Sequence, residues 1–104
     1  MIIEDICYLL KEDRTPRGVH QKPTVTKRMV YCRVRSVGRS EFYQANLAGM
    51  NPEYVLKLSD MVEYQGEMTL RFHDEKWKII RHYMTPDGGV ELTIQRSVAN
   101  AEND

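Results

Sequence analysis

Cysteine and histidine are the residue types in this chain that could support catalysis or bind a metal ion. The two cysteines, Cys7 and Cys32, each stand in an apolar run, and no C-x-x-C occurs. The three histidines, His20, His73 and His82, lack metal-ligand spacing. Thiols on apolar strands are inert packing groups. We therefore expect free, buried thiols, no catalytic, metal or cofactor site, and a protein that is not an enzyme. A small hydrolase that pairs one thiol with a histidine is the enzymatic alternative.

A basic strand face is the clearest candidate for ligand binding. Tyr31, Arg33 and Arg35 alternate with apolar residues and share one side of a predicted strand. Such a face could stack on bases and pair with phosphates of single-stranded nucleic acid, as in a small OB-like module. However, 15 basic and 15 acidic residues give a net charge of zero, which argues against a dedicated nucleic-acid binder. We favour a protein interface or a salt-bridged surface and keep the OB-like module as the alternative.

A long basic loop is predicted over residues 11–27. It has no hydrophobic periodicity, and it contains Pro16, Gly18 and Pro23. A mobile basic segment can contact DNA phosphates or dock against an acidic neighbour, and a plain surface loop is the simpler reading. The candidate channel-facing or DNA-facing residues of this loop are Arg14, Arg17, Lys22 and Lys27.

Charge is distributed unevenly between the two halves of the sequence. Residues 1–52 hold nine basic and five acidic groups, a net +4, and residues 53–104 hold six basic and ten acidic groups, a net −4. Complementary halves suit copies that meet head to tail, but on charge alone we favour chance scatter over a solvated surface.

Alternating hydrophobicity predicts most of the secondary structure. The predicted strands cover residues 1–10, 28–37, 67–72, 76–84 and 90–96, with a short extended piece over 54–58. On the strand at 28–37, Val30, Cys32 and Val34 are expected to point inward. In the C-terminal part the inward positions are Met68, Leu70, Phe72, Trp77, Ile79, Tyr83, Val90, Leu92 and Ile94, whereas Glu67 and Thr93 point outward.

A short helix is predicted from Ser40 to Ala48. Ser40 can cap its first turn, where Glu41 is favourable, and Tyr43 and Leu47 follow at helical spacing. Gly49 and the Asn-Pro pair that follows then end the helix.

These elements predict a single domain over residues 1–104. Residues 67–96 form a three-stranded antiparallel meander, and the helix and the two N-terminal strands are expected to cover its apolar face. The fold class is therefore mainly β with one short α-helix: a small antiparallel β-barrel or sandwich with long loops. Residues 97–104 form a polar, flexible tail. The sequence shows neither a secretory signal nor a membrane span, so we expect a soluble chain made in the cytoplasm.

Several segments, in this order, resemble the head-closure (head–tail joining) protein family of tailed bacteriophages. Ser40-Glu41-Phe42-Tyr43-Gln44-Ala45 is similar to the start of the family's helix. The other similar segments are Asn51-Pro52-Glu53-Tyr54-Val55-Leu56, Glu63-Tyr64-Gln65-Gly66-Glu67, Lys76-Trp77-Lys78-Ile79-Ile80-Arg81 and Asp87-Gly88-Gly89-Val90-Glu91-Leu92-Thr93-Ile94-Gln95-Arg96. The resemblance spans residues 28–96. Each motif is short and consists mainly of packing and turn residues, so their order and spacing carry the similarity.

This resemblance implies a structural role at the head–tail interface of the virion. Family members form a ring, a hexamer or dodecamer in the virion that can be monomeric when free. The ring closes the DNA-filled head below the portal and adaptor and gives the tail a platform. The implied partners are other copies, portal and adaptor proteins, tail proteins and, non-specifically, packaged DNA. Residues 50–61 are a second candidate for the segment that faces the channel. The candidate subunit-interface residues are Arg33, Arg35, Glu41, Tyr43 and Leu47.

Overall fold

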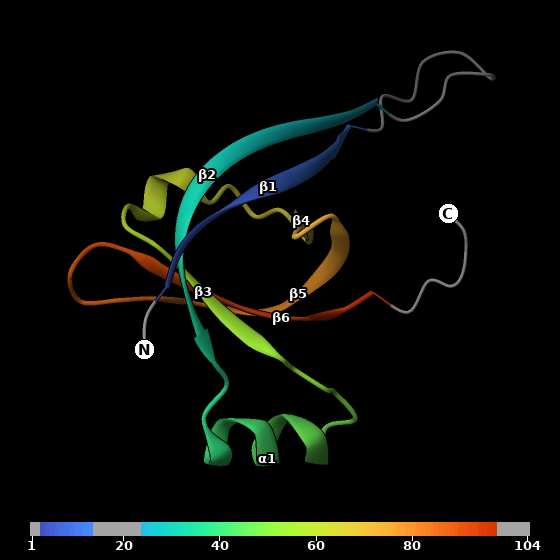
Figure 1. Cartoon of the computed structure of the whole chain (residues 1–104), viewed down its shortest axis with the longest axis vertical. Helices are drawn as coiled ribbons and strands as arrows, with labels where there is room; N and C mark the ends of the chain where they lie inside the picture. Colours follow the sequence, from blue (N-terminus) through green and yellow to red (C-terminus); the bar gives the residue numbers. More distant parts are fainter. Residues whose placement is uncertain (1–2, 14–23, 98–104) are drawn as a thin grey trace.

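A computed structural model describes residues 3–13 and 24–97 of the chain. Figure 1 shows a barrel of strands, with the α-helix at one end and the tips of two long strands toward the other. In chain order the elements are β1 (Ile3–Asp13), β2 (Thr24–Ser36), α1 (Arg39–Leu47), β3 (Tyr54–Leu58), the 3-10 turn η1 (Met61–Glu63), β4 (Thr69–Phe72), β5 (Glu75–Met84) and β6 (Val90–Arg96).

The strands of the described residues close into an antiparallel barrel with the spatial order β1-β2-β3-β6-β5-β4. Closure occurs where β1, already paired with β2, also pairs with β4 around Leu9 and Leu70. Strands β4, β5 and β6 are consecutive neighbours, so the meander predicted from residue 67 onward is confirmed. The predicted fold class is confirmed as well: the protein is mainly β, with a short helix and a small antiparallel barrel.

The core fills the inside of this barrel, as expected for a barrel of this size. Trp77 is its largest side chain, and its indole Nε1 donates a 3.0 Å hydrogen bond to the carbonyl oxygen of Phe72. Tyr54 packs edge-on against Trp77, with ring centroids 5.7 Å apart. The buried core residues are Cys7, Leu9, Val30, Cys32, Val34, Leu56, Leu58, Leu70, Phe72, Trp77, Ile79, Val90, Leu92 and Ile94.

The helix does not cover the core, which corrects one expectation. The N-terminal strands cover the apolar face of the meander, and closure between β1 and β4 completes the enclosure. Helix α1 lies on the outer side of the barrel instead, and none of its residues is buried. Thr93 points outward, as predicted, but it is only 5% exposed, and it lines a hollow of about 390 Å³ together with Ser40, Glu41 and Gln44 of α1.

The helix boundaries agree with the prediction to within one residue, but its cap differs. The helix begins at Arg39 and ends at Leu47, and Gly38 rather than Ser40 occupies the N-cap position. Gly38 has the extended backbone typical of an N-cap, but it has no side chain to accept a hydrogen bond. Gly49, with a φ of 81°, follows the helix end in the left-handed conformation that glycine favours.

The predicted loop over residues 11–27 is shorter than expected. Strand β1 continues to Asp13 and β2 begins at Thr24, with Lys11 opposite Thr26 and Asp13 opposite Thr24. Backbone hydrogen bonds hold this two-stranded arm together whatever the polarity of its side chains, so the loss of hydrophobic alternation did not mark the strand end. Residues 14–23, and residues 98–104 of the predicted tail, lie outside the described part of the chain.

Three predicted facings are wrong, two of them just before β4 and one on β5. Strand β4 begins only at Thr69, and just before it Met68 is 72% exposed while Glu67 is buried, the reverse of the alternating pattern. On β5, Tyr83 is 50% exposed because the pairing with β6 shifts register between Ile79 and Arg81. Such a β-bulge changes the side of the sheet to which the following residues point.

Candidate functional site

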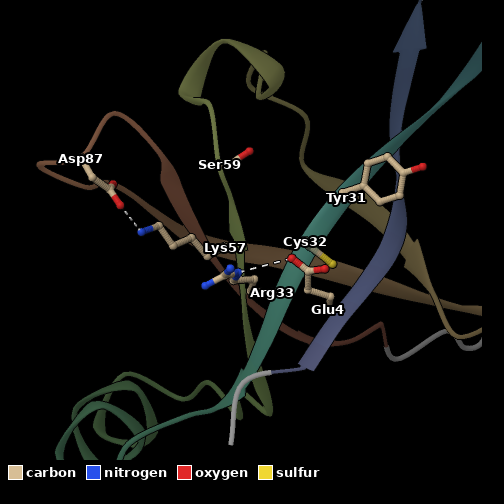
Figure 2. Close-up of a pocket in the computed structure, with 7 residues that line it drawn as sticks. All are labelled: Glu4, Tyr31, Cys32, Arg33, Lys57, Ser59 and Asp87. Atoms are coloured by element: carbon tan, nitrogen blue, oxygen red, sulfur yellow. Dashed lines mark hydrogen bonds and ion pairs between the residues drawn. The ribbon is translucent and has the colours of Figure 1, made fainter.

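A shallow hollow of about 230 Å³ lies on the outer face of the barrel, where β2 and β3 run side by side (Figure 2). The sequence brings residues to it from four segments: β1, β2, the end of β3 and the turn between β5 and β6. The lining residues are Glu4, Tyr31, Cys32, Arg33, Lys57, Ser59 and Asp87.

Two basic side chains stand next to each other in this hollow. Arg33 on β2 and Lys57 on β3 are direct cross-strand partners, a placement that is unfavourable for like charges. Each is compensated by a carboxylate on its far side. Arg33 Nε lies 3.6 Å from Glu4 Oε2, and Lys57 Nζ lies 2.5 Å from Asp87 Oδ2. Figure 2 shows the resulting row across the sheet, in which the two cations lie side by side with a carboxylate at each end.

Asp87 is held in its charged form by this arrangement. The hydrogen bond from Lys57 lowers the pKa of the Asp87 carboxyl well below its ordinary value, and those from the Thr85 hydroxyl and the Gly89 backbone N–H add to the effect. Because both partners are exposed, solvent screens this ion pair and it contributes little to stability.

The aromatic residue of this face is fully available for contact. Tyr31 is 72% exposed and lies at the edge of the hollow in Figure 2. Of the predicted nucleic-acid face, Tyr31 and Arg33 thus share one hollow with Lys57, which the sequence reading did not single out. Lys57 is identified by its position opposite Arg33 on the neighbouring strand. Only the pairing of these two strands in the folded protein reveals that position.

Arg35, the third residue of that predicted face, is engaged elsewhere. Its Nη1 lies 3.5 Å from Glu41 of α1, and its Nη2 lies 3.4 Å from Glu91 of β6. The guanidinium therefore links the first turn of the helix to the barrel. Arg35 and Glu41, both predicted to contact a neighbouring subunit, form this intramolecular bridge.

The C-terminal end of the helix is also held by polar contacts. The Asn46 side-chain amide donates a 3.0 Å hydrogen bond to Asn51, and the Asn51 backbone N–H donates one of 2.9 Å to the Gln95 side chain on β6. Sequence reasoning missed these asparagines, since the Asn-Pro pair indicated only a helix stop. The helix is therefore anchored at both ends without contributing a residue to the core.

The remaining helix candidates are exposed. Tyr43 is 63% exposed and Leu47 is 69% exposed, while Phe42 on the same helix is 42% exposed. These apolar side chains could contact another protein without any rearrangement of the barrel. Tyr43 and Leu47 are the predicted interface residues that the structure leaves most accessible.

Among the candidates for the channel-facing loop, only Lys27 lies within the described residues. It belongs to β2, and its ammonium group lies 5.3 Å from the centroid of the Tyr8 ring. Arg14, Arg17 and Lys22 lie outside the described part of the chain. The alternative segment, residues 50–61, includes the barrel strand β3, whose Leu56 and Leu58 are fully buried.

The cysteines occupy the barrel interior, as predicted. Cys7 and Cys32 are free and buried, at 0% and 3% exposed. A hydrogen bond with Cys32 raises the pKa of the Cys7 thiol far above its ordinary value, and burial raises it further. A thiol kept protonated in this way is a poor nucleophile.

The histidines of the described region lie apart on the barrel surface. His73 Nε2 lies 2.6 Å from the Asp5 carboxylate, whereas the His82 ring packs 5.2 Å from that of Tyr64. Across residues 3–13 and 24–97, no group of three or more His, Cys, Asp or Glu side chains could hold a metal ion. Within the same residues, no helix has the length and apolar character needed to cross a membrane.

Fold and surface together define the class of molecule: a small antiparallel β-barrel with a charged hollow and an externally anchored helix. No known protein-family profile matches the chain, and no curated protein matches it.

Proposed function

We propose that this chain is a structural subunit at the head–tail junction of a tailed bacteriophage or prophage. It assembles into a ring that closes the DNA-filled head and offers the tail a platform, and it acts without catalysis. Its partners are further copies of itself, the portal and adaptor proteins above it, tail proteins below it and, through non-specific contact, packaged DNA. The protein is located in the virion, at the head–tail interface, and it is assembled there in the host cytoplasm.

The observation that carries this proposal is the exposure of the anchored helix. Helix α1 buries none of its residues, yet it presents Phe42, Tyr43 and Leu47 to the outside. A barrel that fills its own core needs no such helix for folding, whereas a protein that assembles with others needs accessible apolar anchors. The helix also begins within the segment whose sequence resembles the head-closure family.

The role can be tested by deleting the gene from the phage or prophage that encodes the chain and then supplying it again. Particles that lack the protein should be DNA-empty heads without tails in electron micrographs, and the wild-type gene should restore tailed virions. Normal tailed virions in the deletion strain would refute the proposal. Portal and capsid genes upstream of this gene, with tail genes downstream, are the expected neighbourhood.

A helix variant tests the contact itself. Tyr43→Ser with Leu47→Ser should leave the thermal unfolding midpoint nearly unchanged, because both side chains are exposed, and should still fail to restore virions. Met84→Ser is the matched control, since Met84 is 46% exposed but belongs to β5 and not to the helix, and this variant should restore them. Full rescue by the helix variant would exclude α1 as the assembly contact.

A nucleic-acid-binding module is the second candidate function, favoured by the exposed Tyr31 beside Arg33 and Lys57. In the part of the chain that the structure describes, the barrel has six strands, unlike the five-stranded OB-fold. Fluorescence anisotropy with a labelled single-stranded oligonucleotide separates the two functions. A module predicts tight binding that Tyr31→Ala with Arg33→Ala abolishes. If the chain is instead a connector subunit, binding should be weak and should be lost at high salt. The double variant should then bind about as weakly as the wild type.

A further inference from the structure

A hollow of about 390 Å³ lies between helix α1 and the outer face of strands β5 and β6. Ser40, Glu41 and Gln44 line it from the helix, and two cross-strand pairs of β5 and β6 line it from the barrel. Its volume is within the range of small-molecule sites, about 300–1,000 Å³. Tyr43 and Leu47 do not line it, so the hollow is separate from the proposed assembly contact of the helix.

A buried hydroxyl group faces this hollow. Thr93 on β6 is only 5% exposed, and no group among residues 3–13 and 24–97 forms a hydrogen bond with its side chain. Its cross-strand neighbours are Val55, which is apolar, and Arg81. Buried hydroxyl groups are nearly always satisfied by protein, water or ligand, because leaving them unpaired costs free energy. Thr93 therefore offers an unused donor and acceptor to whatever occupies the hollow.

The charges around the hollow balance. Arg35 lies 3.5 Å from one oxygen of Glu41 and 3.4 Å from one oxygen of Glu91, so the other oxygen of each carboxylate can accept a further hydrogen bond. Arg81 is exposed and forms no ion pair within the described part of the chain, so its guanidinium can donate. Two cations and two anions sum to zero, and a charged ligand would disturb this balance. The lining therefore favours an uncharged, polar ligand.

Tyr83 adds an aromatic surface to this polar lining. It is 50% exposed and stands opposite Glu91 across the sheet. A sugar ring matches this combination, because each of its hydroxyl groups donates and accepts hydrogen bonds while its C–H face is apolar and packs on aromatic rings. We propose that the hollow binds a neutral saccharide, with the sugar ring on Tyr83 and its hydroxyl groups on Thr93, Glu91 and Arg81. This site goes beyond the proposed function and does not depend on the ring of subunits.

Amide chemical shifts of the isotope-labelled full chain test this site by NMR. Glucose, galactose, mannose and N-acetylglucosamine are each titrated to high millimolar concentration, because a shallow site pays much of its contact energy to fix the ligand and binds weakly. At least one sugar should produce saturable shifts at Gln44, Tyr83 and Thr93. Acetate and methylammonium at the same concentrations should not, since the charges of the hollow are already balanced.

Two pairs of variants locate the contact. Thr93→Val removes the hydroxyl but keeps the shape, and it should weaken sugar binding about fivefold, the effect of one hydrogen bond. Thr69→Val removes the same group from β4, outside the hollow, and should bind as the wild type. Tyr83→Ala should weaken binding at least about fivefold, whereas Tyr83→Phe keeps the ring and should bind as the wild type. The amide spectrum of each variant also shows whether it is folded.

Three results would overturn the inference. The first is the absence of saturable shifts with all of the sugars. The second is sugar binding that Thr93→Val or Tyr83→Ala leaves unchanged, since the contact would then lie elsewhere. The third is an equal response to acetate or methylammonium, which would assign the hollow to ions. The ring is tested by restoration of virions, so failure of the saccharide site would leave the proposed function standing.

Discussion

Arg28 and Glu67, 39 positions apart in the sequence, form an ion pair of 2.9 Å between β2 and the segment before β4. The Glu67 side chain is fully buried, and its other carboxylate oxygen accepts a 2.8 Å hydrogen bond from the Gln65 backbone N–H. The Tyr64 hydroxyl donates to the Glu67 carbonyl oxygen over 2.8 Å. This cluster fixes the path of the chain from η1 into β4.

Replacing Arg28 by methionine should destabilise the fold by about 2–3 kcal/mol, because it leaves the buried Glu67 carboxylate without its cation. Arg33→Met is the matched control on the same strand. Its pair with Glu4 is exposed on both sides, so a loss below about 1 kcal/mol is expected. Urea unfolding monitored by Trp77 fluorescence measures both values. Equal losses of unfolding free energy in the two variants would show that the burial of Glu67 does not determine how much its ion pair with Arg28 stabilises the fold.

Gly89 should tolerate no side chain. A Cβ at this position would lie 2.5 Å from the backbone carbonyl oxygen of Leu58, an atom that β-pairing holds in place. We expect Gly89→Ala to cost about 1–3 kcal/mol of unfolding free energy, as other overpacked sites do. Gly38→Ser is the control, since its Cβ meets no atom within 4 Å and its hydroxyl can cap α1. That variant should keep or raise the melting temperature, and a drop as large as that of Gly89→Ala would contradict the steric explanation.

The Asp5–His73 pair makes a prediction about acid stability. Hydrogen bonding to His73 lowers the pKa of the Asp5 carboxyl below its ordinary value of 3.8, and the Ile6 backbone N–H lowers it further. A group whose pKa is lowered by folding stabilises the fold above its unfolded value, and this contribution disappears as the pH falls through the folded value. The stability difference between the wild type and Asp5→Asn should therefore be full at pH values above 3.8 and shrink below it.

NMR titration of the Asp5 carboxyl carbon tests the cause of this shift. In His73→Ala the pKa of Asp5 should rise toward 3.8, because the strongest contact that lowers it is gone. His82→Ala removes a histidine that packs on Tyr64 and should leave the titration of Asp5 unchanged. Identical Asp5 titrations in the wild type and His73→Ala would rule out the contact.

The two thiols should be unreactive in the native protein. Cys7 and Cys32 are buried, and the pKa of Cys7 is raised by its hydrogen bond with Cys32 and by burial. Reaction with a disulfide reagent should therefore follow global unfolding and accelerate with urea. Lys78→Cys, which places a thiol at an exposed position, should react at once in the folded state. Rapid native labelling of Cys7 or Cys32 would contradict their burial and revive the hydrolase hypothesis.

Local pattern was sufficient for much of the fold. The alternation of Val30, Cys32 and Val34 on β2 gave the buried face of that strand, and Val90, Leu92 and Ile94 did so for β6. The helix was located to within one residue from its turn-forming glycines and the spacing of Tyr43 and Leu47. These features depend on neighbours along the chain, so the order of amino acids alone contains them.

Only the tertiary structure decided how distant segments meet. Pairing of β1 with β4 closes the barrel and leaves α1 outside it, and no local pattern encodes that pairing. The same long-range register sets Arg33 beside Lys57, engages Arg35 with Glu91 and buries Glu67 against Arg28. An ionisable residue before a strand looks solvent-exposed in sequence, because its burial depends on a partner from another strand. The sequence thus determined the elements and most of their faces, whereas contacts between remote strands determined which charges are paired and which apolar residues remain exposed.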